Sequence, residues 1–366
     1  MRTETTKTLP ATLSPSVRSS AVVMRWMRPL LAGGSFTLFT VMMLTVYLSP
    51  FGYMTVTAFK NREMITQPDA PLWPAREASY TYEEQAYPIF GVPTEDGEVH
   101  QWALIRKGRE DSSFVDPENP EAGPIEWQGR WRTLKRVWTF SPRWENFSQV
   151  WGEIRMPLLL RNTFAIAVIG AIGTLLSCTV VAYGFSRFRI PGKSILFTIL
   201  ISTIILPQFV TLVPTYALFQ RIGWVGTWLP LTVPHFFANA YNVFLLRQFF
   251  MTIPRDLDEA AMIDGASPMR TLISIILPQS IPAIIAVGLF HFVFAWNDYF
   301  GPLVYLSTAR HLQPIALGIQ DYNALFSFEP QLIQASSLLG LIVPVALFFA
   351  AQRFFMRGVI ITGVEK

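Results

Sequence analysis

Residues 162–186 read NTFAIAVIGAIGTLLSCTVVAYGFS, a stretch without Asp, Glu, Lys or Arg. An α-helix rises about 1.5 Å per residue, so about 20 apolar residues cross the hydrocarbon core of a bilayer, which is about 30 Å thick. Within lipid, a helix satisfies its own backbone hydrogen bonds. The stretch therefore predicts a membrane-spanning helix between Arg161 and Arg187.

Five other windows of comparable length also lack charged residues, and they cover residues 29–59, 194–220, 222–246, 271–297 and 330–352. Charged residues make up only 15% of the 366-residue chain, against about 25% in soluble domains. The first window follows Arg25 and Arg28, as in a secretory signal. It is about twice as long as the apolar part of a signal, however, and has no small-residue cleavage site. We predict an all-α polytopic membrane protein with six transmembrane helices, surrounded by lipid.

The basic residues of the short loops predict the orientation, because loops rich in Lys and Arg stay in the cytoplasm. Such residues gather before the first window, between the second and third, between the fourth and fifth, and after the sixth. The two remaining short loops have one each, Arg221 and Arg310. We therefore expect both termini in the cytoplasm. This bias also explains the calculated pI of about 9.2, so no nucleic-acid partner is expected.

Residues 60–155 differ from the rest of the chain, with twelve Lys and Arg against sixteen Asp and Glu, a net charge of −4. Long translocated segments are exempt from the charge rule, so we expect a small extracytoplasmic insertion between the first two helices. Trp102–Ile105 and Trp127–Trp138 predict short strands, with turns at Asp96-Gly97 and Asn119-Pro120. The single cysteine, Cys178, forms no intramolecular disulfide, so this domain must be held by packing.

These expectations divide the chain into five parts. They are a cytoplasmic tail at 1–28, a transmembrane helix at 29–59, the extracytoplasmic insertion at 60–155, a core of five helices at 156–356 with a cytoplasmic loop at 251–281, and a cytoplasmic tail at 357–366.

The cytoplasmic loop predicts a helix–turn–helix elbow. Asp256, Asp258 and Glu259 open a short helix, where carboxylates complement the positive end of the helix dipole. Gly265 supplies a turn, and Ser267-Pro268 begins a second helix. The spacing fits a docking element and equally fits an ordinary polar connector.

The residues of this loop resemble the EAA loop of ABC-importer permeases: Glu259-Ala260-Ala261, then Gly265, then Leu277-Pro278. Several other segments are similar to the carbohydrate-uptake branch, which is maltose-permease-like and binding-protein-dependent. They are Ile253-Pro254, Asp264-Gly265-Ala266, Arg161-Asn162-Thr163 and Ala295-Trp296-Asn297-Asp298. The insertion at 60–155 departs from the family, in which this connection is often short.

The resemblance implies an ABC type I importer permease fold in the prokaryotic cytoplasmic (inner) membrane. It implies a coupling element formed by Glu259, Ala260, Ala261, Asp264 and Gly265, which docks on a separate ABC ATPase dimer. ATP and Mg are then bound by that ATPase, and no cofactor is expected in this chain. The other implied partners are an extracytoplasmic solute-binding protein and a second homologous permease, either different or identical.

The implied cargo is a sugar or oligosaccharide, and the alternative is another polar solute such as glycerol phosphate. In similar permeases the external loop between the last two helices, here within 312–330, reaches the binding protein, and the tail at 357–366 contacts the ATPase. For the insertion, contact with the binding protein or a lid over the path is a hypothesis.

Polar side chains inside the spans are candidates for the translocation path, because they are costly against lipid. The candidates are His235, Asn239, Asn242, His291, Asn297 and Asp298. The alternative for each of them is an interhelical hydrogen bond.

An enzymatic reading rests on Asp256-Leu257-Asp258, a D-x-D pattern that some membrane glycosyltransferases use to hold a metal. Both carboxylates are already explained as charges at a helix start. The sequence has no phosphate-binding G-x-x-x-x-G-K-[ST] loop, so ATP hydrolysis must come from a partner. Four histidines and one cysteine offer little material for a metal site. We expect no catalytic residues and no metal.

Overall fold

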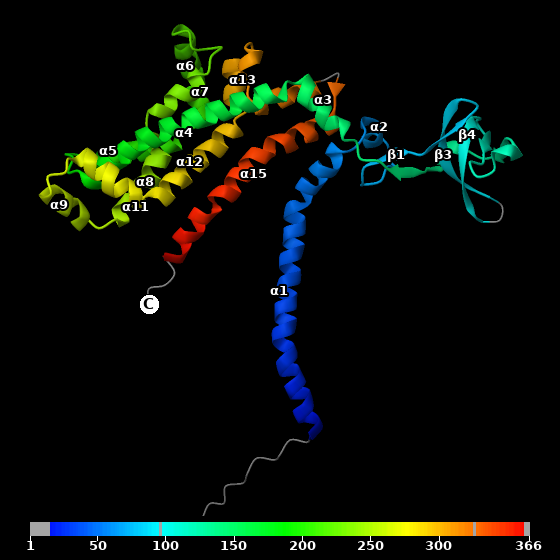
Figure 1. Ribbon diagram of the computed structural model, residues 1–366, viewed down its shortest axis with the longest axis horizontal. Helices are drawn as coiled ribbons and strands as arrows, with labels where there is room; N and C mark the ends of the chain where they lie inside the picture. The colour runs from blue at the N-terminus through cyan, green and yellow to red at the C-terminus, as the bar shows by residue number, and fades with distance from the viewer. Residues whose placement is uncertain (1–14, 95–96, 325–326, 362–366) are drawn as a thin grey trace, which may run out of the picture. The chain divides into compact units, whose positions relative to one another are not determined.

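The computed structural model describes residues 15–94, 97–324 and 327–361, and the chain forms two units, residues 1–54 and 55–366. The long helix α1 (Pro15–Ala58) contains all the described residues of the first unit (Figure 1). Its stretch Gly33–Ala58 is long and apolar enough to cross a membrane. The apolar side chains there are exposed, among them Phe36 and Tyr47, as expected for a helix that faces lipid.

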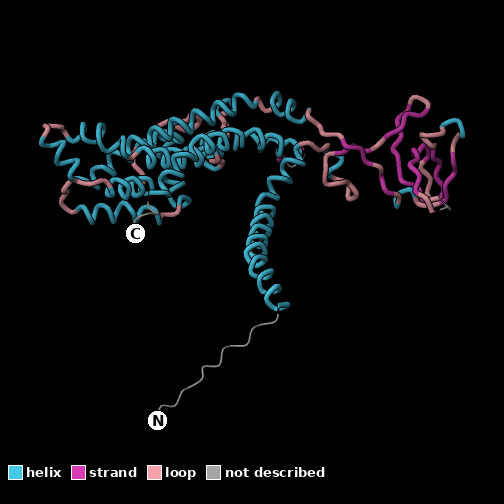
Figure 2. The backbone as a smooth tube through the Cα atoms, turned by 60° about the horizontal axis from the view of Figure 1, so that its bottom comes forward, coloured by secondary structure: helices cyan, strands magenta, loops and turns pink. Residues whose placement is uncertain are grey.

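The β-rich part of the second unit begins after α2 (Arg62–Ile65). Its main antiparallel sheet has the order β2-β3-β4-β5-β6, and β7 pairs with β3 (Figure 2). The strands are β2 (Ser79–Tyr82), β3 (Gln85–Pro93), β4 (Val99–Arg106), β5 (Asp111–Val115), β6 (Ile125–Gln128) and β7 (Lys135–Arg136), with 3₁₀ turns η1 (Pro120–Ala122) and η2 (Trp131–Thr133). Phe90, Val92, Leu104 and Phe114 form its buried core.

The strands predicted around Trp102–Ile105 and within Trp127–Trp138 are confirmed, the second as parts of β6, β7 and β8 (Trp138–Phe140). The turn at Asn119-Pro120 is confirmed as η1. Of the other predicted turn, Gly97 has a positive φ of 80°, and Asp96 lies outside the described residues.

A short antiparallel pair, β1 (Ala75–Glu77) and β8 (Trp138–Phe140), connects this sheet to the membrane helices. It leads into α3 (Glu145–Glu153). The buried Asn146 of α3 donates from Nδ2 to the carbonyl oxygens of Ala58 (2.8 Å) and Lys60 (2.9 Å). One side chain thus satisfies carbonyls at the C-terminal end of α1 and fixes α3 against it.

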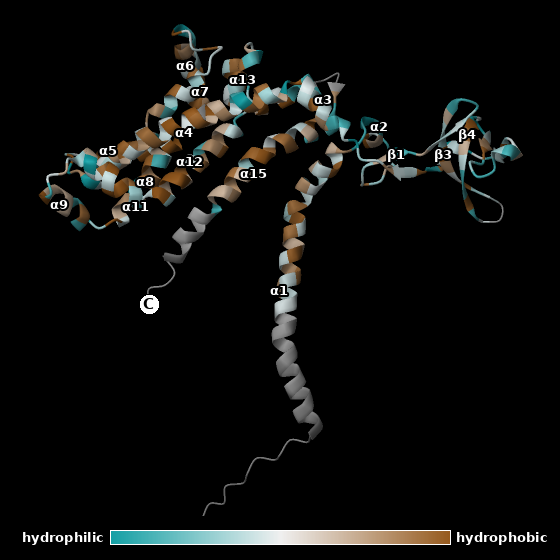
Figure 3. Ribbon diagram, viewed as in Figure 1, coloured by the Kyte–Doolittle hydropathy of each residue, from teal (hydrophilic) through white to brown (hydrophobic). Residues whose placement is uncertain are grey.

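The helix α4 (Met156–Arg187) is the centre of the membrane part and packs against α8 (Ala240–Thr252) and α12 (Ile281–Trp296). The last long helix, α15 (Pro330–Ile361), packs on α12 and α3. Figure 3 shows hydrophobic residues along these helices. The other helices are α5 (Lys193–Ser202), α6 (Gln208–Arg221), α7 (Leu229–Thr232), α9 (Asp256–Ile263), α10 (Pro268–Thr271), α11 (Leu277–Gln279), α13 (Phe300–Leu306) and α14 (Ile315–Gly318).

Short segments connect these helices. They are the 3₁₀ turns η3 (Thr203–Ile205), η4 (Val233–Phe236), η6 (Arg310–Leu312) and η7 (Ile319–Tyr322), the π-helical η5 (Leu272–Ile276), and the strand pair β9 (Asn323–Ala324) and β10 (Ser327–Phe328).

Three of the six predicted windows hold an unbroken apolar helix in the described residues: Gly33–Ala58, Met156–Arg187 and Pro330–Gln352. Two further windows hold bent pairs, Lys193–Ile205 with Phe209–Arg221 and Pro268–Gln279 with Ile281–Trp296, the second bent by 82°. Five spans result if each pair is one span. The count of six stays a prediction.

The window 222–246 differs from the continuous helix that its composition predicts. Gly223 and Gly226 have positive φ angles of 76° and 83° and form turns. Pro230 and Pro234 lie at the second positions of α7 and η4. A backbone N–H in the first turn of a helix has no partner within the helix, so its absence in proline costs nothing there. The chain therefore enters the membrane part as short pieces before α8 begins, capped by the Asn239 side chain.

Small residues let α4 lie close to its neighbours. A Cβ on Gly170 would be 2.5 Å from Nε2 of His291, and one on Gly173 would be 2.6 Å from the ring of Phe236. Both distances are too short for a real contact, so only glycine fits. Cys178 is fully buried on the same helix. The small face of α4 is therefore a helix-packing surface.

We predict that Gly170→Val lowers the stability of the protein by about 1–3 kcal/mol, because an added side chain in a packed interior forces its neighbours apart. Thermal unfolding in detergent measures the change. Gly184→Val is the matched control, since a Cβ on this glycine of α4 meets nothing within 4 Å. Equal unfolding temperatures for the two variants would contradict the close packing.

Candidate functional site

The predicted elbow is confirmed in its local structure. The helix α9 begins at Asp256 with three acidic residues in its first turn and ends at Ile263. Gly265 follows with φ of 77°, a left-handed conformation that glycine adopts without strain. The Ser267 hydroxyl then accepts a hydrogen bond from the backbone N–H of Arg270 and caps α10, which begins with Pro268.

The predicted coupling residues do not all lie on the same face of α9. Glu259, Ala260, Asp264 and Gly265 are exposed, while Ala261 is buried, with 6% exposure. Ala261 therefore belongs to the inner face of the helix, one turn after Asp258.

Two large apolar side chains at the end of α9 were not singled out from the sequence. Met262 is 61% exposed and Ile263 is 86% exposed. Adjacent apolar side chains with this much exposed surface form a candidate docking surface. The helical period contained the signal, because residues directly after the inward-facing Ala261 must point outward.

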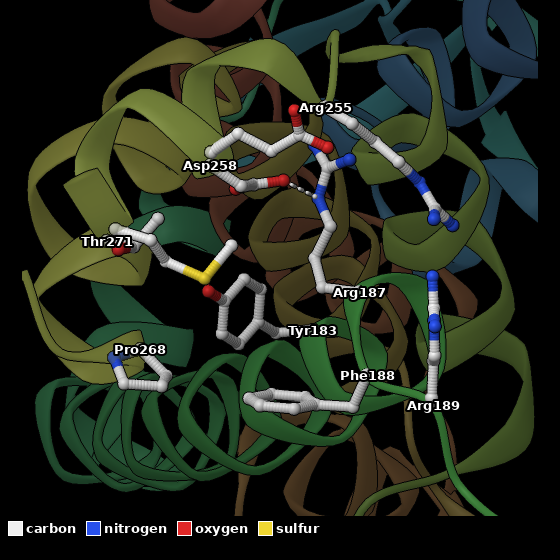
Figure 4. Close-up of a pocket in the computed structure, with 10 residues that line it drawn as sticks. Tyr183, Arg187, Phe188, Arg189, Arg255, Asp258, Pro268 and Thr271 are labelled. Carbon is white, nitrogen blue, oxygen red and sulfur yellow. Dashed lines mark ion pairs between the residues drawn. The ribbon is translucent and has the colours of Figure 1, made fainter.

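A mostly buried ion pair joins the elbow to α4. Nε of Arg187, the last residue of α4, lies 3.1 Å from Oδ2 of Asp258, and the two side chains are 7% and 14% exposed. Nη2 of Arg187 also donates to the Ile253 carbonyl at 3.0 Å. Figure 4 shows the pair, with Tyr183 of α4 beside it. These two contacts hold the elbow directly to the C-terminal end of α4.

The pair borders a cleft of about 350 Å³ between α4 and the elbow (Figure 4). The lining residues are Tyr183, Arg187, Phe188, Arg189, Arg255, Asp258, Glu259, Met262, Pro268 and Thr271. The cleft combines apolar walls with three guanidinium groups and the two carboxylates of Asp258 and Glu259, which leaves one formal positive charge.

Four of the six predicted path residues come together. His235, Asn239, Asn242 and His291 all line a cleft of about 350 Å³. The rings of His235 and His291 are 4.4 Å apart, centroid to centroid, and Nδ1 of His291 lies 3.1 Å from the Thr174 hydroxyl. Nε2 of His291 is buried and has no hydrogen-bond partner among the described residues. Polar atoms from α4, η4, α8 and α12 thus converge on one site.

The other two candidates lie elsewhere. Asn297 is exposed and donates locally to the Val293 carbonyl. Asp298 accepts from the backbone N–H of Gly301 at 3.0 Å and lines a second cleft of about 260 Å³, together with His235. Thr215 and Tyr305 also line this second cleft. They were not singled out from the sequence, where nothing distinguishes their hydroxyls from others in apolar windows.

Comparison with known protein families identifies the class of this protein. Residues 176–361, about half of the chain, match the family model described as "Binding-protein-dependent transport system inner membrane component". The chain belongs to this family. The protein is a permease subunit of a binding-protein-dependent ABC importer, located in the inner membrane. Permease subunits of this family are not catalytic, and a separate subunit hydrolyses ATP. Family membership therefore decides against the glycosyltransferase reading.

Individual relatives agree with this assignment. The permease is 30% identical over 222 residues to the osmoprotective compounds uptake permease protein GgtD of Synechocystis sp., covering 60% of this chain and 74% of the relative. It is 34% identical over 225 residues to the sn-glycerol-3-phosphate transport system permease protein UgpE of Pectobacterium atrosepticum, covering 59% and 79%.

A solved structure supports the fold. A chain of a bacterial ABC transporter involved in the import of the acidic polysaccharide alginate aligns with a TM-score of 0.57 at 17% identity, covering 94% of this permease and 98% of that chain. This likeness confirms the ABC type I importer permease fold that the sequence predicts.

We predict that Arg187→Met loosens the elbow, because it leaves the Asp258 carboxylate buried without its partner. Breaking a buried pair in this way costs about 3–5 kcal/mol. Hydrogen exchange of the α9 backbone amides should therefore become faster.

Two comparisons test the ion pair. Arg189 lines the same cleft but forms no ion pair among the described residues. We therefore expect the α9 amides of the Arg189→Met variant to exchange as slowly as those of the unaltered protein. The double variant Arg187→Met, Asp258→Leu should lose less than the two single variants together. Additive losses would show that the two side chains do not interact.

Proposed function

We propose that this permease imports a sugar or oligosaccharide that a solute-binding protein delivers, and that an ABC ATPase dimer docked on α9 drives the transport. The observation that carries the proposal is the elbow: an exposed apolar tip at Met262 and Ile263, fastened by a buried ion pair to the central helix. A tip of this kind suits a partner's cleft, and the fastening transmits the partner's motion.

The coupling residues have different roles in this proposal. Glu259, Ala260 and Asp264 present the face that meets the ATPase. Ala261 packs inward, and Gly265 makes the turn. ATP and Mg are bound by the ATPase. A second homologous permease, different or identical, completes the path.

The proposed topology has six spans and both termini in the cytoplasm, from the distribution of Lys and Arg. Residues 60–155 then lie on the extracytoplasmic side of the membrane. The loop at 312–330, which is proposed to reach the binding protein, lies on the same side. For the insertion itself, contact with the binding protein or a lid over the path stays a hypothesis. The tail at 357–366 is proposed to contact the ATPase, and its second half, residues 362–366, lies outside the described residues.

For the translocation path we propose His235, Asn239, Asn242 and His291, supported by their shared cleft. Asp298 is proposed for the neighbouring cleft that also contains His235. Asn297, which is exposed, is proposed to line the path only where a partner permease covers it.

A second candidate cargo is glycerol phosphate, favoured by the identity of 34% to the glycerol-3-phosphate permease. Uptake of maltose and of glycerol 3-phosphate into proteoliposomes separates the two. The vesicles contain the permease, its partner subunits and ATP, and the binding protein is supplied outside. Uptake of neither solute would contradict both candidates.

We predict that Gly265→Val abolishes ATP-driven uptake, because a β-branched residue does not adopt the φ of 77° that the tip requires. The readouts are solute uptake and the stimulation of ATP hydrolysis by the loaded binding protein. The matched control is Gly223→Val, which has a φ of 76° and equally open surroundings. Both variants should lose similar stability, and only Gly265→Val should uncouple. Uncoupling in both would mean that strain alone, and not the docking tip, is responsible.

A further inference from the structure

A polar cleft of about 470 Å³ lies at the opposite end of α4 from the elbow. It is formed by the start of α2, by α3, by η7 and by the first turn of α15, and its lining is Arg62, Arg143, Asn146, Gln149, Glu153, Asp321, Tyr322, Glu329, Gln331 and Leu332. Since α4 separates this cleft from the elbow, the cleft is extracytoplasmic in the proposed topology.

The floor of the cleft is firmly packed. Tyr322 and Leu332 belong to a buried apolar cluster with Val150, Met156 and Leu159. This cluster joins α3, α4 and α15 beneath the polar side chains. A cleft on such a floor keeps its shape, which is the condition for a preorganised binding site.

Hydrogen bonds hold most of the lining in place. Arg62 forms an ion pair with Glu329, which also accepts from Nε2 of Gln331 at 2.6 Å. Glu153 accepts from Nε2 of Gln149 at 2.9 Å and from the Tyr322 hydroxyl at 3.1 Å. Burial and the Glu153 carboxylate raise the pKa of the Tyr322 phenol, so this phenol stays protonated and remains a donor.

One buried acceptor is left over. Oε1 of Gln331 has no hydrogen-bond partner among the described residues, and Gln331 is only 6% exposed. An unsatisfied buried oxygen is unfavourable. This oxygen has almost no exposed surface, so a donor of a bound molecule satisfies it once the Gln331 side chain, which lines the cleft, turns toward that molecule. Arg143 lies on the same cleft, with an exposed side chain that donates to the Asn61 side chain and keeps further N–H groups.

The charges of the lining select against anions. Two guanidinium groups face three carboxylates, those of Glu153, Asp321 and Glu329, which leaves one formal negative charge. Asp321 has a long, exposed contact with Arg310 at 3.9 Å, which neutralises it little. A hydroxyl group donates to carboxylates and to Gln331 and accepts from guanidinium groups, so it fits every part of this lining.

We propose that this cleft is a binding subsite for the hydroxyl groups of a neutral, sugar-like solute, occupied as the solute leaves the binding protein. The proposal rests on the proposed import of a carbohydrate and narrows it to uncharged cargo. It also gives the insertion a role, because Arg62 and Arg143 at its two ends form one wall of the subsite.

Saturation-transfer NMR tests the subsite with a matched pair of probes, glucose and glucose 6-phosphate. The full-length permease is assembled with its partner subunits in lipid nanodiscs, without ATP or binding protein. We expect saturation of the glucose protons and little for glucose 6-phosphate. Gln331→Leu should weaken glucose binding about five- to ten-fold, the effect of losing one hydrogen bond.

Arg143→Gln should weaken binding similarly, and its exposed side chain makes misfolding no concern. Glu145→Gln, on the first turn of α3 but outside the lining, should bind as the unaltered protein does. Equal binding of both probes, or unchanged binding in both Gln331→Leu and Arg143→Gln, would overturn the proposal. Because the assay needs no ATP, such a result leaves the coupling role of α9 untouched, whereas uptake failure with intact glucose binding would count against the proposed transport alone.

Discussion

The membrane part of this permease depends on the close approach of α4 to its neighbours. Gly170 and Gly173 leave no room for a side chain beside His291 and Phe236. In lipid, helices gain nothing from hydrophobic burial against one another, so such contacts between small residues supply much of the association energy. The shorter segments around α4, among them η4, α8 and α12, pack directly against it.

The two ends of α4 then lie at the elbow and at the polar cleft, the two surfaces for which we propose roles in transport. At its C-terminal end, Arg187 holds Asp258 of the elbow in a mostly buried ion pair. At its N-terminal end, α4 supports the floor of the polar cleft through Met156 and Leu159. A single helix therefore runs from one surface to the other, and the rings of His235 and His291 lie against its middle, beside Gly170.

Sequence reasoning succeeded where one physical rule dominates. The charge-free windows at 162–186 and 330–352 are helices, and the acidic start of α9, its glycine turn and the Ser267 cap lie where local chemistry places them. It failed at 222–246, where composition predicts one helix but Gly223, Gly226, Pro230 and Pro234 divide the chain into short pieces. Hydropathy averages over a window and therefore does not register such breaks.

The sequence by itself determined the class of protein, the apolar segments and the elbow, because lipid exclusion and helix capping act on neighbouring residues. Only the tertiary structure decided which polar residues meet. It joined Arg187 to Asp258 across 71 positions, gathered His235 and His291 in one cleft while leaving Asn297 outside, and assembled Arg62, Glu153 and Gln331 into one lining. These contacts between side chains depend on how whole helices pack, and no local sequence pattern encodes them.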